Sequence, residues 1–467
     1  MTKTATVLSV KLVGRMRSTP ADYIKARSQS SGCNKARYRA ITYRQCQRGF
    51  CLANGIRSYK YIMSIKLPGH AFSLFPLMVM LLGNAIAHSL FMIGFPIIGR
   101  TMGISELLTG TLLSVSAFGM MIFAPFWGRY TDKHGQKAPI VIGIMSTALF
   151  LILTAGLIEF QTSLELTIPT LFALFFLLRL TQSVGVAGLM PSAQAYVADR
   201  TSHRQRLSGM GFIGATFGFG SIIGGYFAMS FGVKHFPSVL FILGIIMLII
   251  GFGYRFLKTN PPSHESQNTE LPFSSFPQPL TPILPFALIT FCVLLVYGIL
   301  QQTTGLRLQD QLGFSPQEAL KGSGGLLTSS MISMATGQVI LTYFTTEHSN
   351  RLMVIGFFVG LLSLAYLAIS NTYVDMLIAM ICLGGAMSLI IPANLALLSQ
   401  TAGKKHQAYA ASINLLGKGL GWTAGPVMGS LLYQFTPTSP VWSSIGLFLV
   451  ALGITIYQRK KTGFKKT

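Results

Sequence analysis

The sequence predicts an all-α integral membrane protein with twelve transmembrane helices in two pseudo-symmetric bundles of six. Charged residues make up only 10% of the 467 positions and apolar residues 51%, whereas soluble proteins carry about a quarter charged residues. Long stretches contain no charge at all, and two helices in opposite halves share a glycine pattern. A spanning helix needs roughly 20 mainly apolar residues, because hydrocarbon offers its backbone no hydrogen-bonding partner.

Twelve stretches meet this requirement, in two sets of six. The first set, in the predicted bundle 73–257, is 73–99, 107–127, 139–158, 166–189, 207–231 and 237–256. The second set, in the predicted bundle 283–457, is 283–302, 326–344, 352–370, 374–398, 408–435 and 441–457. Between the bundles, residues 258–282 are polar and carry six prolines, a composition typical of a flexible linker. Residues 458–467 form a basic tail.

The net charge of +24 is a topology signal and does not indicate nucleic-acid binding. Loops on the side of the termini, with the tail, hold sixteen Lys and Arg, whereas loops on the other side hold four. Those four are Arg100, Lys234, Arg307 and Lys321. The positive-inside rule then places both termini in the cytoplasm of a cell with this protein in its inner or plasma membrane.

Residues 1–62 fit nothing else in the chain, since they are basic and lack an apolar run. Cys33, Cys46 and Cys51 lie there without zinc-finger spacing. One interpretation is that Met63 is the native start, because the chain then enters the first helix directly. The alternative is a disordered basic tail on the anionic leaflet.

The predicted fifth and eleventh helices share a pattern of glycines. Gly220 aligns with Gly425 at an offset of 205 residues, and the same offset pairs Gly214 with Gly419 and Gly224 with Gly429. Such glycines let helix backbones approach closely, and for any one of them simple packing is an adequate explanation. The repetition between halves favours two related bundles around a central path, which is the architecture of alternating-access carriers.

Residues 128–137 resemble the cytoplasmic signature of the major facilitator superfamily, G-x-L-x-D-R-x-G-R-K. The residues that fit are Gly128, Asp132, Lys133, Gly135 and Lys137, while Tyr130 and Gln136 depart from the pattern. The resemblance implies the major facilitator fold and a charge-assisted latch that closes the cytoplasmic side. The alternative is a solvated loop that obeys the positive-inside rule.

Two further elements resemble the family's proton-coupled drug antiporters. In the fourth helix, Arg179, Gln182 and Gly185 fit R-x-x-Q-G-x-G, with Ser183 in place of glycine. In the fifth helix, Gly220, Gly224 and Gly225 fit G-P-x-x-G-G with Ser221 in place of proline, and the eleventh helix keeps the proline as Gly425-Pro426. Residues 196–199 also match the family's loop between the fourth and fifth helices. The resemblance implies a secondary transporter that exports a small organic molecule in exchange for protons.

Charged groups inside helices are functional candidates because they are costly in the bilayer. Arg179 and Lys418 lie inside helices and are expected to face the central path. His88 is either a proton-exchanging group or a packing residue. Neutral candidates for the lining are Asn84, Gln182, Gln338, Asn394 and Asn414, of which about half are expected to be interhelical contacts only.

No Asp or Glu lies in the middle of a predicted helix. Two cations without a fixed anion favour an anionic or carboxylate-bearing metabolite, such as an organic acid or a siderophore, over a lipophilic cation. The partners expected are this small molecule, protons and the lipid bilayer, with the protein a monomer. Importing a nutrient organic anion, or acting as a non-transporting sensor or scaffold, are the alternatives. No catalytic set, cofactor motif or metal-ligand cluster stands out, so no enzyme, cofactor or metal is predicted.

Overall fold

The computed structural model describes residues 71–200, 206–256, 282–341, 349–402 and 406–463. The chain divides into one unit that ends at Ala71 and a second, Phe72–Thr467, which holds all the helices discussed below. The predicted segment 1–62 and nearly all of the predicted linker 258–282 lie outside the described residues. The described part of the chain contains helices and no strands.

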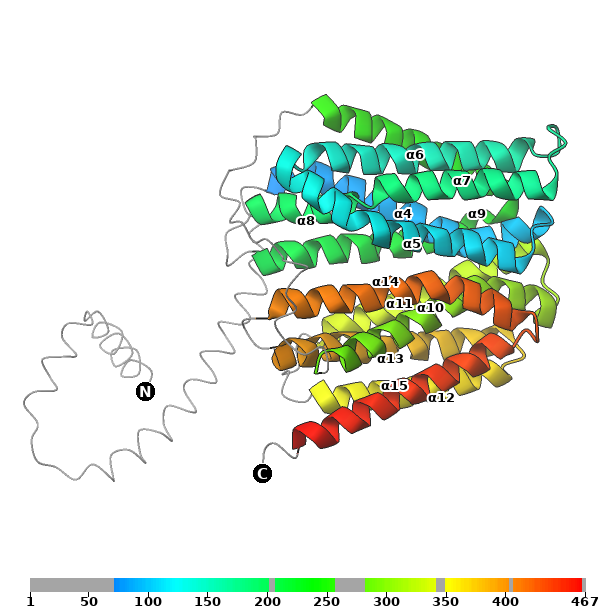
Figure 1. Cartoon of the computed structure of the whole chain (residues 1–467). Helices are drawn as coiled ribbons and strands as arrows, with labels where there is room; N and C mark the ends of the chain where they lie inside the picture. The colour runs from blue at the N-terminus through cyan, green and yellow to red at the C-terminus, as the bar shows by residue number, and fades with distance from the viewer. Residues whose placement is uncertain (1–70, 201–205, 257–281, 342–348, 403–405, 464–467) are drawn as a thin grey trace, which may run out of the picture. The chain divides into compact units, whose positions relative to one another are not determined.

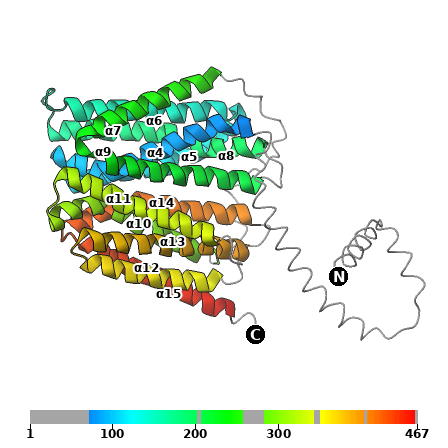
Figure 2. The same cartoon turned by 180° about the vertical axis from the view of Figure 1, so that it is seen from behind.

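The helices fall into two groups that follow each other along the chain (Figures 1 and 2). The first bundle comprises α4 (Ala71–Thr101), α5 (Glu106–His134), α6 (Lys137–Phe160), α7 (Ile168–Val186), α8 (Leu189–Arg200) and α9 (Arg206–Phe256). The second comprises α10 (Leu284–Leu312), α11 (Pro316–Leu341), α12 (Ser349–Ile369), α13 (Tyr373–Ala402), α14 (Gln407–Tyr433) and α15 (Ser439–Gly463). The last helix therefore continues past residue 457, where the sequence predicted the basic tail to begin.

The helix α9 is two helices joined at Gly232. This residue has φ 67° and ψ −172°, a conformation that glycine adopts without steric cost. The break separates the fifth and sixth predicted spans. Ten spans of the described residues are long and apolar enough to cross a membrane, with α7 and α8 counted as one span, α9 counted once and α14 not among them. Division of α9 makes eleven spans, and α14 as the twelfth stays a prediction.

The fourth predicted span ends differently from the prediction. In the last turn of α7 the carbonyl of Val184 accepts a bond from the indole Nε1 of Trp127 at 2.6 Å. Between α7 and α8, a Cβ on Gly188 would lie 2.9 Å from the indole ring. The helix then resumes as α8, because Ala193, Tyr196 and Val197 recur at helical spacing and are all buried. Residues 196–199 are therefore helical and do not form a loop.

The predicted loop 128–137 is also mostly helical. α5 continues to His134 and α6 begins at Lys137. Gly135 ends α5 with φ 85°, and its N–H donates to the carbonyl of Thr131 at 2.8 Å. Only Gly135 and Gln136 separate the two helices, so Asp132, Lys133 and Lys137 of the signature lie in the end turns of helices.

The two bundles meet along two helix pairs, α5 with α14 and α9 with α11. We call the end at which α4 begins and α15 finishes the terminal end, and the opposite end the distal end. Arg100, Lys234, Arg307 and Lys321, which the sequence assigned to loops, lie in helices toward the distal end. Arg307 is only 3% exposed, so it is an internal group and contributes nothing to a loop charge count.

Candidate functional site

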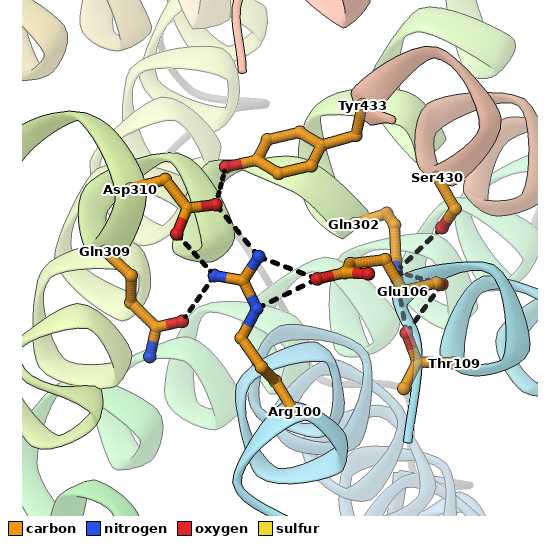
Figure 3. Close-up of polar contacts among 8 residues, drawn as sticks. All are labelled: Arg100, Glu106, Thr109, Gln302, Gln309, Asp310, Ser430 and Tyr433. Atoms are coloured by element: carbon orange, nitrogen blue, oxygen red, sulfur yellow. Dashed lines mark hydrogen bonds and ion pairs between the residues drawn. The ribbon is translucent and has the colours of Figure 1, made fainter. Parts of the chain in front are cut away.

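A polar network joins the two bundles at the distal end (Figure 3). Arg100 lies in the last turn of α4, and its guanidinium lies between the carboxylates of Glu106 and Asp310. It donates to Glu106 Oε1 at 3.0 and 2.7 Å and to Asp310 Oδ1 and Oδ2 at 2.8 Å each. Gln309 accepts a further bond from Arg100 Nη1 at 3.1 Å. The two parallel bonds to Asp310 form a bidentate pair, the strongest common geometry for this contact.

The members of this network divide unequally between the bundles. Arg100 and Glu106 both belong to the first bundle, across the turn from α4 to α5. Asp310 belongs to the second bundle, where the hydroxyl of Tyr433 on α14 donates to its Oδ2 at 2.7 Å. Of the bonds that Arg100 makes, those to Asp310 and Gln309 cross between the bundles (Figure 3).

A second cross-bundle contact lies deeper, at Gln302 of α10. Its Nε2 donates to Thr109 Oγ1 at 3.1 Å and Ser430 Oγ at 3.0 Å, with a longer contact of 3.4 Å to the carbonyl of Glu106. The side chain is fully buried. Beside it, a Cβ on Gly110 would lie 2.6 Å from the carbonyl of Pro426. The amide therefore joins α5 to α14 where their backbones are already close.

An aromatic cluster lies near the middle of the helices and also draws on both bundles. The ring of His88 on α4 lies 6.1 Å from Phe217 of α9 and 6.1 Å from Trp422 of α14, between ring centroids. Trp422 in turn meets Tyr297 of α10 edge-on at 5.5 Å. These separations are those of favourable aromatic pairs. His88 therefore lies where the two bundles meet, and its ring packs against aromatic rings from both bundles.

The two predicted cations have different surroundings. Arg179 is 1% exposed inside the first bundle, with its guanidinium carbon 4.6 Å from the ring centroid of Phe91 and 5.0 Å from that of Phe150. Its Nη1 donates to Gln182 Oε1 at 2.7 Å, while Nε and Nη2 have no hydrogen-bond partner in the described structure. Lys418 is exposed and lies one turn before Trp422.

Three of the neutral residues predicted to line the path make side-chain hydrogen bonds between helices. Asn84 Oδ1 accepts a bond from Thr147 of α6 at 3.1 Å. Thr290 of α10 donates to Asn414 Oδ1 at 2.6 Å and accepts from Asn394 Nδ2 at 2.9 Å, which links α10, α13 and α14. Gln338 is half-buried. Asn84, Asn394 and Asn414 thus make interhelical contacts of the kind expected for part of this set.

The residues predicted to form the gate lie at the terminal end. Asp132 and Lys133 are exposed, and Gly128, Thr131 and Asp132 line a surface hollow with Gln194, Ala195 and Ala198 of α8, together with Pro191 and Met210. Gln136, which departs from the family signature, donates from Nε2 to Asp199 Oδ2 at 2.5 Å. This bond ties the α5–α6 turn to the end of α8.

The predicted glycines separate into structural classes. A Cβ on Gly220 would lie 2.6 Å from Ala85 of α4, and one on Gly224 would lie 2.5 Å from the carbonyl of Ile86. Gly225 faces Thr328 of α11, in the other bundle, and Gly425 faces Gly298 of α10. Pro426 follows Gly425 and packs at Gly298 and Gly110. Gly214 has open space around it, so its alignment with Gly419 carries no packing role.

The family model described as Major Facilitator Superfamily matches residues 77–328 and 286–466. The chain belongs to the Major Facilitator Superfamily. The resemblance seen in residues 128–137 is thereby confirmed. As a member of this superfamily, the protein is a multi-pass membrane transporter and not an enzyme.

Curated relatives of this major facilitator protein match over most of their length. It is 26% identical over 375 residues to multidrug resistance protein 2 of Bacillus subtilis (strain 168), covering 78% of this chain and 89% of the relative. It is 22% identical over 376 residues to the quinolone resistance protein NorA of Staphylococcus aureus (strain MSSA476), covering 78% and 91%. The expected kinship with efflux proteins therefore holds at the level of the family.

Solved structures show the same fold at low sequence identity. A bacterial homologue of the human lysosomal transporter Spinster, in an inward-facing and unoccupied conformation, matches with a TM-score of 0.69 at 13% identity and covers 84% of this chain and 97% of that one. The nucleoside transporter NupG matches with a TM-score of 0.64 at 16% identity, covering 83% and 98%. These likenesses establish the major facilitator fold for this chain.

Sequence reasoning missed the distal network of this major facilitator protein. Arg100 was counted as a loop charge, and Glu106, Asp310 and Tyr433 were not singled out. A usable signal existed: the chain has only 12 Asp and Glu, and Glu106 and Asp310 lie in predicted distal loops, as Arg100 does. Pairing across 210 positions cannot, however, be inferred from one sequence without the fold.

Proposed function

We propose that this protein exports small organic molecules from the cytoplasm by proton-coupled alternating access, in the cell inner membrane, with its terminal end toward the cytoplasm. One observation carries the proposal: the cross-bundle hydrogen bonds of Arg100 and Gln302 gather toward the distal end. A carrier must form and break such contacts at each end in turn. The structure is thus closed at the distal end.

The gate residues supply the complementary closure in this proposal. Asp132 and Lys133 are exposed at the terminal end, where they are available to meet charged groups of the second bundle when that end closes. Opening of the distal end would then exchange the Arg100–Asp310 pair for a pair at the terminal end. Charge-assisted contacts at both ends make each closed state a discrete energy minimum.

Export is favoured over import by the relatives. Both are named for drug resistance, and resistance by a membrane carrier requires movement of the drug away from its target. The terminal end would admit substrate from the cytoplasm, and the distal end would release it. The importing alternative would use the same two states in the opposite order.

An anionic substrate is favoured by the distribution of charge. Every carboxylate in the described helices lies within four residues of a helix end, as at Asp132 or Asp310. Arg179 stacks on Phe91, and one turn earlier on α4 His88 packs against Trp422, which follows Lys418 on α14. These contacts run from Arg179 in the first bundle toward Lys418 in the second. An anion there would offset the cost of holding Arg179 away from bulk water and would lie within the field of Lys418.

The experiment is untargeted mass spectrometry of medium and cells from a deletion strain and its complemented parent. An anionic compound retained in the mutant's cells and missing from its medium is the expected result. A control strain complemented with Arg179→Ala should behave as the deletion. A compound left unconsumed in the mutant's medium would instead make the protein an importer.

A further inference from the structure

The distal network contains an asymmetry between its two carboxylates. If the bundles separate at this end, Arg100 keeps Glu106, because both lie on the first bundle. Asp310 loses Arg100 and keeps only the hydroxyl of Tyr433. Arg100 therefore keeps a carboxylate partner whether the distal end is closed or open, whereas Asp310 has a cationic partner only when that end is closed.

This asymmetry determines which group binds a proton when the end opens. A carboxylate held by a bidentate guanidinium resists protonation, and one deprived of its cation accepts a proton more readily. By linkage, a proton that binds the open state more tightly than the closed state favours the open state. Glu106 has Arg100 beside it in both states and so gains no comparable preference.

We propose that Asp310 is the carboxylate through which protons from the distal side favour the distal-open state, binding a proton as the Arg100–Asp310 pair separates and returning it to the distal solution as the pair reforms. The inference rests on the proposed alternating access and adds to it the identity of a proton-binding group. His88, the sequence-based candidate, is a ring packed among Phe217 and Trp422, and Asp310 replaces it in this role.

Four other ionisable groups near the distal end have hydrogen-bond partners within the second bundle. Arg307, one turn before Asp310 on α10, donates from Nη2 to the carbonyl of Ser370 at 3.1 Å and from Nε to Gln311 at 2.5 Å. Glu318 of α11 accepts from Ser315, and Tyr373 of α13 donates to the carbonyl of Gly322. Asp375 of α13 accepts from Thr372 and Tyr366. Each of these contacts lies within the second bundle, so bundle separation leaves it intact. The remaining ionisable groups at the distal end of the described residues are Lys234 and His235 on α9, Lys321 on α11, and Glu159 and Glu165 at the α6–α7 turn.

The test is a distance measurement that needs no substrate. In a chain with its native cysteines replaced, spin labels are attached at Ser163→Cys and Phe435→Cys, two exposed distal positions on different bundles. Double electron–electron resonance in lipid nanodiscs then reports the distal-open fraction from about pH 8 to about pH 4.5, which brackets the range over which a carboxylate losing its cation is titrated. The ratio of open to closed protein should rise on acidification, by at most about tenfold per pH unit for one proton.

Three variants make the assignment specific. Asp310→Asn should raise the open fraction at about pH 8, the upper end of that range, and remove the pH response, because no proton remains to be bound. Glu106→Gln should keep the response. Asp375→Asn, which alters an exposed distal carboxylate bonded only within its own bundle in the contacts shown, is the matched control and should also keep it.

The outcomes separate the assignment from the proposed function. A response that persists in Asp310→Asn, or one that is lost in Glu106→Gln instead, overturns the assignment to Asp310 while the end still opens. A distal end that stays closed in every variant and at every pH contradicts alternating access, and with it both proposals.

Discussion

Gly425 of α14 lies directly against Gly298 of α10, so that a Cβ on Gly425 would lie 2.8 Å from the Cα of Gly298. The corresponding contact in the first bundle joins Gly220 of α9 to Ala85 of α4. In each half, therefore, the fifth helix packs on the first through a glycine. The glycine repeat in the sequence reflects this shared contact, which lies inside each bundle and not between them.

Replacement of Gly220 by leucine should destabilise the first bundle. The added side chain would meet Ala85 and the carbonyl of Leu82, 2.6 and 2.8 Å from the Cβ position, and overpacking of this kind costs about 1–3 kcal/mol or more. Thermal unfolding followed by size-exclusion chromatography should show a lower melting temperature than the wild type. Gly214→Leu on the same helix is the control, because nothing lies within 4 Å of its Cβ position. Equal melting temperatures for the two variants would contradict the close packing of Gly220 against α4.

Removal of the Gln302 amide should weaken the distal closure. Gln302→Leu loses the bonds to Thr109 and Ser430, and a buried hydrogen bond contributes about 1 kcal/mol, with a further cost for partners left unpaired. A cysteine placed at buried Ser114 of α5 should then react faster with a membrane-impermeant maleimide. Gln301→Leu changes the neighbouring buried amide without touching the contacts of Gln302, and should leave the rate unchanged. Faster labelling in both variants would indicate general loosening of α10.

Replacement of Arg179 should abolish transport without preventing membrane insertion. Arg179→Ala removes the guanidinium from Phe91 and Phe150 and leaves Gln182 without its donor. Arg179→Lys keeps the charge but not the planar stacking geometry, so it should recover only part of the activity. The measurement is transport per molecule of membrane-inserted protein, with Lys234→Ala, an exposed cation at the distal end, as the control. Full transport by Arg179→Ala would exclude this residue from the site.

Hydrophobic patterning predicted the helices better than it predicted their ends or partners. The stretch 139–158 falls within α6, and 352–370 nearly coincides with α12, because an apolar run of spanning length has few other stable states in a bilayer. Helix ends were missed where polar residues continue a helix beyond the apolar run, as at Asp132 in α5. Local composition does not record such continuations.

The candidate site was predictable only in part, for a different physical reason. The cost of a charge in the membrane marked Arg179 and Lys418 individually. The pairing of Arg100 with Asp310, by contrast, depends on how two bundles face each other, and each residue alone resembles an ordinary helix-end charge. Similarly, the sequence contained Trp422 and His88 but no indication that their rings meet.

The central claim is that protons drive an anionic molecule outward. Its most direct test is uptake by everted membrane vesicles with an acid interior, with fluorescein, a planar carboxylate, and ethidium, a planar cation, as probes. We predict fluorescein uptake that stops when nigericin collapses the pH gradient and that is lost in Lys418→Gln, with weaker uptake of ethidium. Uptake that is indifferent to the pH gradient would contradict proton coupling, and uptake of ethidium alone would contradict the assignment of an anionic substrate.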